Sequence, residues 1–140
     1  MSLRKYIKNT ADKVFSQYIR AKGADRHGYC KCITCGKREH WKDMDAGHYV
    51  TRARWGTRFD EDNVFPQCRR CNRFEEGRKP EFTRYLRDRY DSYDPAADGN
   101  IVDSLIIRSN RTKTFTLDEL KEWVKDWRAE IKKMYIVKSL

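Results

Sequence analysis

Two Cys-x-x-Cys pairs, Cys32/Cys35 and Cys68/Cys71, constrain the fold of this chain more than any other feature. Each pair can place two sulfurs on one metal ion, and four thiolates suit the tetrahedral geometry of zinc. The segment between the pairs contains several specific polar residues, so we expect it to do more than connect them. The spacing therefore predicts a structural Zn²⁺ ion bound by these four cysteines.

The residues around each pair indicate the kind of zinc fold. Cys32-Ile-Thr-Cys35-Gly36 is typical of a zinc knuckle, a tight turn whose glycine can adopt a positive φ. The second pair precedes a segment, from Asn72 onward, that can continue as a helix. A knuckle, a β-hairpin and a second pair carried by a helix predict a treble-clef site in an α+β fold. Cys30 is not the expected ligand, because pairing it with Cys35 would abandon the x-x spacing.

The length of 140 residues predicts one domain, with room for a single hydrophobic core. We divide it into a basic N-terminal helix (1–24), a zinc-stapled core (29–91) and a loop with a C-terminal helical segment (92–140). No apolar run is long enough to cross a membrane, and the N-terminus lacks the apolar segment of a secretory signal. Cysteines in metal spacing favour a reducing compartment, so the expected location is the cytoplasm.

The charge of the chain predicts a polyanionic partner. There are 31 Lys and Arg residues against 21 Asp and Glu, a formal net charge of +10. The excess is uneven, because residues 1–36 contain eight basic and two acidic residues, whereas residues 81–140 contain twelve and eleven. We therefore expect a nucleic-acid-binding surface on the N-terminal arm and the zinc core.

Apolar residues at three- and four-residue spacing predict an amphipathic helix over residues 3–21. Ser2 is the expected N-cap and Gly23 the expected stop at the C′ position. The opposite face is basic, and its side chains either are solvated or contact DNA. We include three of them among the expected DNA contacts: Lys5, Lys8 and Lys13.

The second half of the chain predicts further helices. Pro80 is expected in the first turn of a helix that reaches about residue 90, followed by a loop over 91–100. Residues 101–107 fit either a short helix or a strand. Thr116 starts a capping box, and the helix after it has an apolar stripe. This stripe is expected to dock on the N-terminal helix, or on a second subunit in a homodimer.

The segment between the cysteine pairs contains the candidate site. The sequence from Asp45 to Val50 predicts a strand that includes His48, and residues 60–63 predict a polar turn before a strand at Val64–Phe65. Between them, residues 51–58 alternate basic and aromatic side chains, which suits phosphate contacts and stacking on unpaired bases. An ordinary hairpin loop with exposed charges is the alternative. The expected DNA contacts of this loop are Arg52, Arg54, Trp55 and Arg58.

The arrangement of these polar residues resembles the zinc-bearing HNH (ββα-metal) nucleases. Those enzymes combine a knuckle, a strand ending in histidine, an Asn-Val or Asn-Leu step, and Cys-x-x-Cys followed by His or Asn. Here these positions hold His48, Asn63 and Asn72. More narrowly, AGHYVTRARW and RFDEDNVFPQCRRCN resemble the NinG/Rap family of lambdoid phages over about residues 11–90. The resemblance implies a metal-dependent DNA endonuclease acting on branched recombination intermediates such as Holliday junctions, D-loops or splayed ends.

The resemblance also implies roles for individual residues. His48 would be the general base that takes a proton from water, and Asn63 would orient it by holding the loop backbone. Arg52 and Arg54 would bind the phosphate. Zinc with four cysteine ligands has no open position, so catalysis requires a second ion. The amide oxygen of Asn72 favours Mg²⁺ or Mn²⁺ as that ion. Arg69 and Arg70, between the last two cysteines, complete the expected DNA contacts.

The carboxylate ligand of this second ion is not fixed by the sequence. In many HNH enzymes a ligand directly precedes the histidine, but this chain has Gly47 there. Asp45 is our candidate, although strand alternation would place it on the face opposite His48 unless a β-bulge at Gly47 restores it. Asp60 and Glu76 are alternatives.

Two other functions fit parts of the sequence. A restriction or homing nuclease of the HNH class would share the core, but the chain shows no added base-reading module. A non-catalytic zinc-stapled DNA-binding adaptor would keep the cysteines and the basic arm, and His48 would then only cap its hairpin. The adaptor has no need for His48, Asn63 and Asn72 together.

Overall fold

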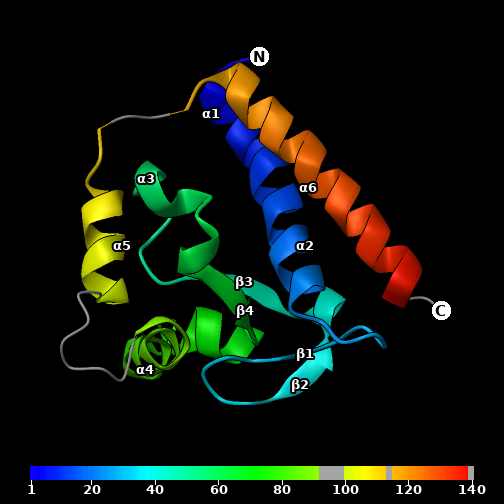
Figure 1. Ribbon diagram of the computed structural model, residues 1–140, viewed down its shortest axis with the longest axis vertical. Coiled ribbons are helices and arrows are strands. Elements are labelled where there is room, and N and C mark those ends of the chain that lie inside the picture. The colour runs from blue at the N-terminus through cyan, green and yellow to red at the C-terminus, as the bar shows by residue number, and fades with distance from the viewer. Residues whose placement is uncertain (92–99, 113–114, 139–140) are drawn as a thin grey trace.

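The computed structural model describes residues 1–91, 100–112 and 115–138, with side chains as far as Tyr135. It confirms the α+β class: two small antiparallel sheets lie between helices (Figure 1). One sheet pairs β1 (Tyr29–Lys31) with β2 (Arg38–His40), and the other pairs β3 (Asp45–His48) with β4 (Val64–Gln67). Among the described residues, no helix combines the length and apolarity that crossing a membrane requires.

The N-terminal helix runs without interruption through α1 (Leu3–Tyr6), the π-helical turn η1 (Ile7–Ala11) and α2 (Asp12–Lys22). Ser2 caps it as predicted, because its Oγ accepts from the Lys5 N–H at 3.2 Å. Gly23 is not a left-handed stop, since its φ is −80°. A glycine is needed there because a Cβ would lie 2.7 Å from Cγ of Pro66.

The last helix, α6 (Leu117–Lys138), lies beside the N-terminal helix and runs in the same direction (Figure 1). Its start is capped by Thr116, whose Oγ1 accepts from the Glu119 N–H at 3.1 Å. Phe15 of α2 and Trp127 of α6 pack with ring centroids 4.8 Å apart. The predicted docking on the N-terminal helix is confirmed, and it covers much of the stripe that suggested a homodimer.

A second layer of helices packs on the other side of the β3–β4 sheet. It comprises α4 (Lys79–Tyr90), with Pro80 in its first turn as predicted, and α5 (Ile101–Ser109). The segment 101–107 is therefore helical, and the side chain of Asn100 caps its first turn. Most of the predicted loop over 91–100 lies outside the described residues. The buried side chains of this layer are Phe65, Phe82, Leu86, Ile101 and Leu105.

The register of β3 and β4 determines which side chains share a face. Asp45 lies opposite Gln67, and the ladder continues without a bulge to His48 opposite Val64. Asp45 and Gly47 therefore face the α4 side, whereas His48 faces the α2 side. The bulge considered at Gly47 is absent. Glycine is required for another reason, because a Cβ at this position would overlap the side-chain amide of buried Gln67.

Short helical turns complete the chain around these sheets. Two of them, α3 (Trp55–Arg58) and the 3₁₀ turn η3 (Glu61–Asn63), lie in the connection from β3 to β4. A 3₁₀ turn, η2 (Trp41–Asp43), joins β2 to β3. The π-helical turn η4 (Arg70–Phe74) follows β4 and contains Cys71. These turns position the polar residues of the candidate site.

Candidate functional site

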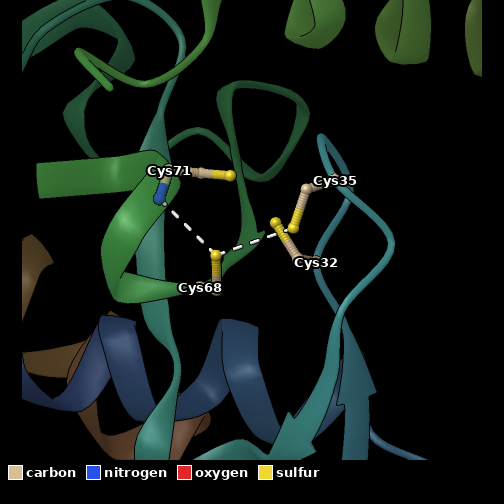
Figure 2. A group of neighbouring side chains, drawn as sticks. All are labelled: Cys32, Cys35, Cys68 and Cys71. Atoms are coloured by element: carbon tan, nitrogen blue, oxygen red, sulfur yellow. Dashed lines mark hydrogen bonds between the residues drawn. The ribbon is translucent and has the colours of Figure 1, made fainter. Parts of the chain in front are cut away.

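The four paired cysteines come together as predicted. Cys32 and Cys35 reach the cluster from the loop after β1, and Cys68 and Cys71 from the end of β4 and η4 (Figure 2). Their sulfurs all lie within 4.8 Å of one another, and those of Cys35 and Cys68 are 3.7 Å apart. Sulfurs at the corners of a tetrahedron with Zn–S bonds of about 2.3 Å are about 3.8 Å apart, so the cluster can bind zinc.

Local backbone geometry forms the first half of this cluster. The Gly36 N–H donates to the Cys32 carbonyl at 2.9 Å, and the Cys32 N–H donates to the Lys37 carbonyl at 2.8 Å. Gly36 has φ +81°, the left-handed conformation predicted for the knuckle. In the second half, the Cys71 N–H donates to the Cys68 sulfur at 3.5 Å. The turn geometry thus directs both pairs toward one point.

The thiols in this cluster differ in how readily they ionise. Burial raises the pKa of Cys32, but hydrogen bonds from the Thr34 hydroxyl and nearby backbone N–H groups outweigh it and lower the pKa to about 6. Burial and the neighbouring sulfurs raise the pKa of Cys68 to about 12. A divalent cation would favour ionisation of all four thiols, because a metal deprotonates the thiols that coordinate it.

Cys30 is not part of the cluster. It is fully buried, and its Sγ donates to the Arg20 carbonyl at 3.0 Å. This thiol therefore packs beside the clustered cysteines and links β1 to α2. The choice of Cys32 over Cys30 as the clustered residue is confirmed.

His48 lies at the end of β3 in a defined orientation. Its Nε2 is 2.9 Å from the backbone carbonyl of Arg58. A carbonyl oxygen only accepts hydrogen bonds, so in the neutral ring Nε2 carries the proton and Nδ1 keeps a lone pair. The lone pair makes Nδ1 the atom that can accept a proton.

The surroundings of His48 favour its neutral form. Burial is the largest effect and lowers its pKa to about 4, and the positive charge of Arg52 acts in the same direction. The Arg58 carbonyl and the carboxylate of Asp12 act against it without reversing it. His48 is therefore neutral at pH 7, as a general base must be, although a low pKa also makes it a weaker base. A phosphate anion beside it would raise its pKa again.

The pH dependence of the free energy of unfolding should reveal the lowered pKa of His48, whose side chain is half-buried. Between the ordinary pKa of 6.5 and the folded value of about 4, the unfolded chain binds more protons, so acid favours unfolding. We expect the free energy of unfolding to be at its full value above pH 6.5 and to fall by up to about 3 kcal/mol as the pH drops to about 4. Urea titrations across this range measure the effect. His48→Gln should flatten the slope, whereas His27→Gln, at an exposed position, should leave it in place.

Asn63 braces the loop that follows His48. It is fully buried, and its Nδ2 donates to the carbonyls of Val50 and Thr57 at 3.0 and 3.1 Å. Its Oδ1 accepts from the Val50 N–H at 2.8 Å. The side chain thus links Val50, just after β3, to Thr57 in α3, the residue directly before Arg58.

Asp45 and Asn72 also come together, on the other face of β3. Asn72 Nδ2 donates to Asp45 Oδ2 at 3.0 Å, and the Arg73 guanidinium donates to both Asp45 oxygens at 2.8 and 2.9 Å. Burial raises the pKa of Asp45, but these bonds outweigh it and hold the pKa below its usual value. A carboxylate beside an amide oxygen suits Mg²⁺ or Mn²⁺, although the ion would compete with Arg73. Among the described residues, no hydrogen bond joins this pair to His48.

The two alternative carboxylates are placed differently. Asp60 Oδ2 accepts from Arg108 at 3.0 Å, and Asp60 Oδ1 accepts from the Asp62 N–H, so it caps η3. Glu76 is exposed and has φ +53°, in the sharp turn between η4 and α4. Neither is hydrogen-bonded to His48 or Asn72 among the contacts of the described residues.

The basic residues of the loop divide into exposed and internal ones. Arg52 and Arg54 are exposed, as are Arg69, Arg70 and the three lysines expected to contact DNA. Arg58 is directed inward and pairs with Asp12, so a contact with DNA would require breaking that pair. Trp55 stacks on Phe115 with ring centroids 5.8 Å apart, inside a core cluster. Its ring is therefore used in packing rather than presented for base stacking.

A basic groove of about 730 Å³ lies along the N-terminal helix beside this loop. Its helical side carries Lys8, Lys13 and Arg20, and its loop side carries Arg52 and Arg58. Asp12 is the acidic residue among them, and the sequence reasoning missed it. Asp12 lies one helical turn after Lys8, and this spacing is the only sequence signal that places the two side chains on one face. The ion pair with Arg58 gives no such signal, because Arg58 is 46 residues away.

Comparison with known proteins gives one family match. The model of a family described as "Bacteriophage Lambda NinG protein" matches residues 1–136. No curated protein matches the chain. No solved structure matches it either.

Proposed function

Because the chain belongs to the NinG family, we propose that it is a metal-dependent DNA endonuclease of the HNH type that cuts branched DNA. The observation that supports this best is the state of His48. Its Nε2 is held by the Arg58 carbonyl, which leaves Nδ1 as the proton acceptor, and burial keeps the ring neutral.

In the proposed reaction, His48 Nδ1 accepts a proton from water as the water oxygen attacks the scissile phosphorus. The bond from phosphorus to the leaving oxygen then breaks. Asn63 keeps the loop in place and Arg52 binds the phosphate oxygens. The zinc cluster holds the knuckle against β4 and η4 in a treble-clef arrangement and takes no part in the chemistry. A Mg²⁺ or Mn²⁺ ion would supply positive charge that stabilises the leaving oxygen when bound. Asn72 and Asp45 are the proposed ligands from the sequence, but Asp45 lies on the face of β3 opposite His48 and is bonded to Arg73, so this pair does not by itself place an ion beside the base.

The basic groove along the N-terminal helix supports DNA as the partner. Lys8, Lys13 and Arg52 line it from opposite sides, so a strand in the groove would pass the loop that holds His48. Phosphate contacts of this kind position a strand without reading its sequence. Such a groove fits an enzyme that does not read base sequence.

The test is a cleavage assay with labelled four-way junction, splayed duplex and plain duplex, each with Mg²⁺, Mn²⁺ or EDTA. We expect the wild-type protein to cut the branched substrates only when a divalent metal is present. His48→Ala should reduce the rate by about 10²–10⁴-fold, the usual contribution of a general base, and should bind the junction unchanged. His27→Ala, at an exposed histidine, is the matched control and should cut normally.

Other results would identify a different function. Equal cutting of plain duplex would favour a restriction or non-specific nuclease. Tight junction binding with no cutting under any metal, by either the wild type or the variants, would favour the DNA-binding adaptor. Full activity of His48→Ala would contradict the proposed mechanism.

A further inference from the structure

Asp12 makes the most enclosed ion pair of the basic groove. Its Oδ1 accepts from Arg58 Nε at 2.9 Å, and its Oδ2 accepts from Arg58 Nη2. The two side chains are 17% and 15% exposed, so solvent screens the pair far less than a surface pair. A bidentate pair of this kind fixes the guanidinium in one orientation.

Arg58 in turn connects this pair to His48. Its Nη1 donates to the Arg52 carbonyl at 2.7 Å, and its own carbonyl holds His48 Nε2 at 2.9 Å. The residue is thus anchored to α2 by its side chain, to the loop by a second bond, and to the imidazole by its backbone. Releasing the guanidinium would free the end of α3 that carries the carbonyl.

A π-helical turn in the N-terminal helix directly precedes Asp12. The backbone N–H of Asp12 donates to the Ile7 carbonyl, five residues earlier, at the end of the π-helical turn η1. A π turn changes the angular position of every later side chain, and such turns are frequent at functional sites. The preceding turn therefore helps to set the direction in which Asp12 points.

We propose that Asp12 is a positioning residue for the base histidine: through Arg58 it fixes the backbone carbonyl that holds His48 with Nδ1 free. This inference rests on the proposed nuclease function. Asp12 also contacts two arginines to different degrees. Arg58 is bound tightly, whereas Arg52 is 3.8 Å from Asp12 and 62% exposed. A phosphate in the groove can draw Arg52 away without disturbing the carbonyl that orients the base.

The charged groups around His48 come from three directions. Asp12 faces it from α2, and Arg52 and Arg58 from the loop and α3. From α4, Lys79 Nζ donates to the His48 backbone carbonyl at 3.4 Å. Asp12 is the acidic group among them, so its removal changes the charge as well as the geometry. Two substitutions are needed to separate these effects.

The test compares Asp12→Ala with Asp12→Asn, which loses the charge but can still accept one hydrogen bond from Arg58. Junction cleavage gives kcat and KM, and long-range ¹H–¹⁵N NMR of the imidazole gives the tautomer of His48. Asp12→Ala should lower kcat at least tenfold with little change in KM, and His48 should lose its single Nε2–H tautomer. Asp12→Asn should keep the tautomer and most of kcat. Asp126→Asn, an exposed residue on α6, is the charge-matched control.

A double-mutant cycle with Arg58→Ala tests whether the two residues act together. If Asp12 works through Arg58, the double variant should lose no more kcat than either single variant. An Asp12→Ala protein with unchanged kcat and an unchanged His48 tautomer would overturn the proposal, as would additive losses in the cycle.

If Asp12→Ala does not fold, a changed tautomer in folded Asp12→Asn would contradict positioning by the hydrogen bond. If the wild type does not cut DNA, the nuclease proposal fails, and the tautomer still decides the role of Asp12.

Discussion

Replacing Cys71 with serine is expected to unfold the zinc region of the protein at 25 °C. The buried apolar core at this site consists, among the described residues, of Cys32, Cys68 and Cys71 together with Met44 and Cys30. So few apolar side chains cannot hold two loops together alone. Binding of a structural zinc ion contributes about 10–16 kcal/mol in isolated fingers, comparable with the total stability of a small domain of about 5–15 kcal/mol.

The measurement combines metal content with thermal unfolding. Wild-type protein should contain one zinc ion per chain. A strong chelator should lower the unfolding midpoint, because the region around the cysteines loses its fold while the other buried clusters keep theirs. Cys71→Ser should behave like chelated wild type. Cys30→Ala is the matched control, because Cys30 is buried in the same core but is not one of the four clustered thiols. This variant should keep its zinc, and its free energy of unfolding should fall by only about 1–2 kcal/mol, because it loses one hydrogen bond and leaves a small cavity. An unchanged unfolding midpoint after chelation would show that the cysteines do not need a metal.

The features that the sequence predicted correctly are those set by short segments. The knuckle follows from two cysteines and Gly36, whose +81° φ completes a turn within five residues. At both helix caps, the hydroxyl of Ser2 or Thr116 accepts a hydrogen bond from the backbone N–H three residues later. The identity of the clustered cysteines follows from their spacing. None of these depends on how distant segments pack.

The features that were missed depend on packing between distant segments. Gly23 ends its helix with a φ of −80°, and a glycine is required there because Pro66, 43 residues later, lies where a Cβ would be. Trp55 stacks on Phe115, a contact that a local pattern of arginines and aromatic rings cannot reveal. Arg58 looked like a surface cation because its partner, Asp12, belongs to another helix.

The same limit applies to the candidate site. Strand alternation correctly placed Asp45 and His48 on opposite faces, because the ladder from Asp45 to His48 has no bulge. It could not show that Asn72 and Arg73 would both bind the Asp45 carboxylate. It also could not show which backbone carbonyl would meet the histidine ring. That contact depends on how the loop after β3 folds back over the strand.

Asn63→Asp is expected to damage both the fold and the proposed activity. The new carboxylate could still accept from the Val50 N–H, but its second oxygen would face the carbonyls of Val50 and Thr57, which are also acceptors. A buried charge against two carbonyl dipoles is costly, so we expect a loss of about 3–5 kcal/mol at pH 7. Protonation restores one donor, so the pKa of the new acid should be raised and part of the stability should return as the pH falls.

Two further variants, Asn63→Ala and Asn110→Ala, show the cause of this loss of stability and activity. Asn63→Ala leaves all three backbone partners of Asn63 unpaired without adding charge, so its stability should lack the recovery in acid. Asn110 is exposed at the end of α5, and its variant should unfold like the wild type. Cleavage is then measured where every variant is folded. Slow cutting by both Asn63 variants would mean that the brace holds the carbonyl of Arg58, and with it His48, in place. Normal cutting by a folded Asn63→Ala would mean that Asn63 serves the fold alone.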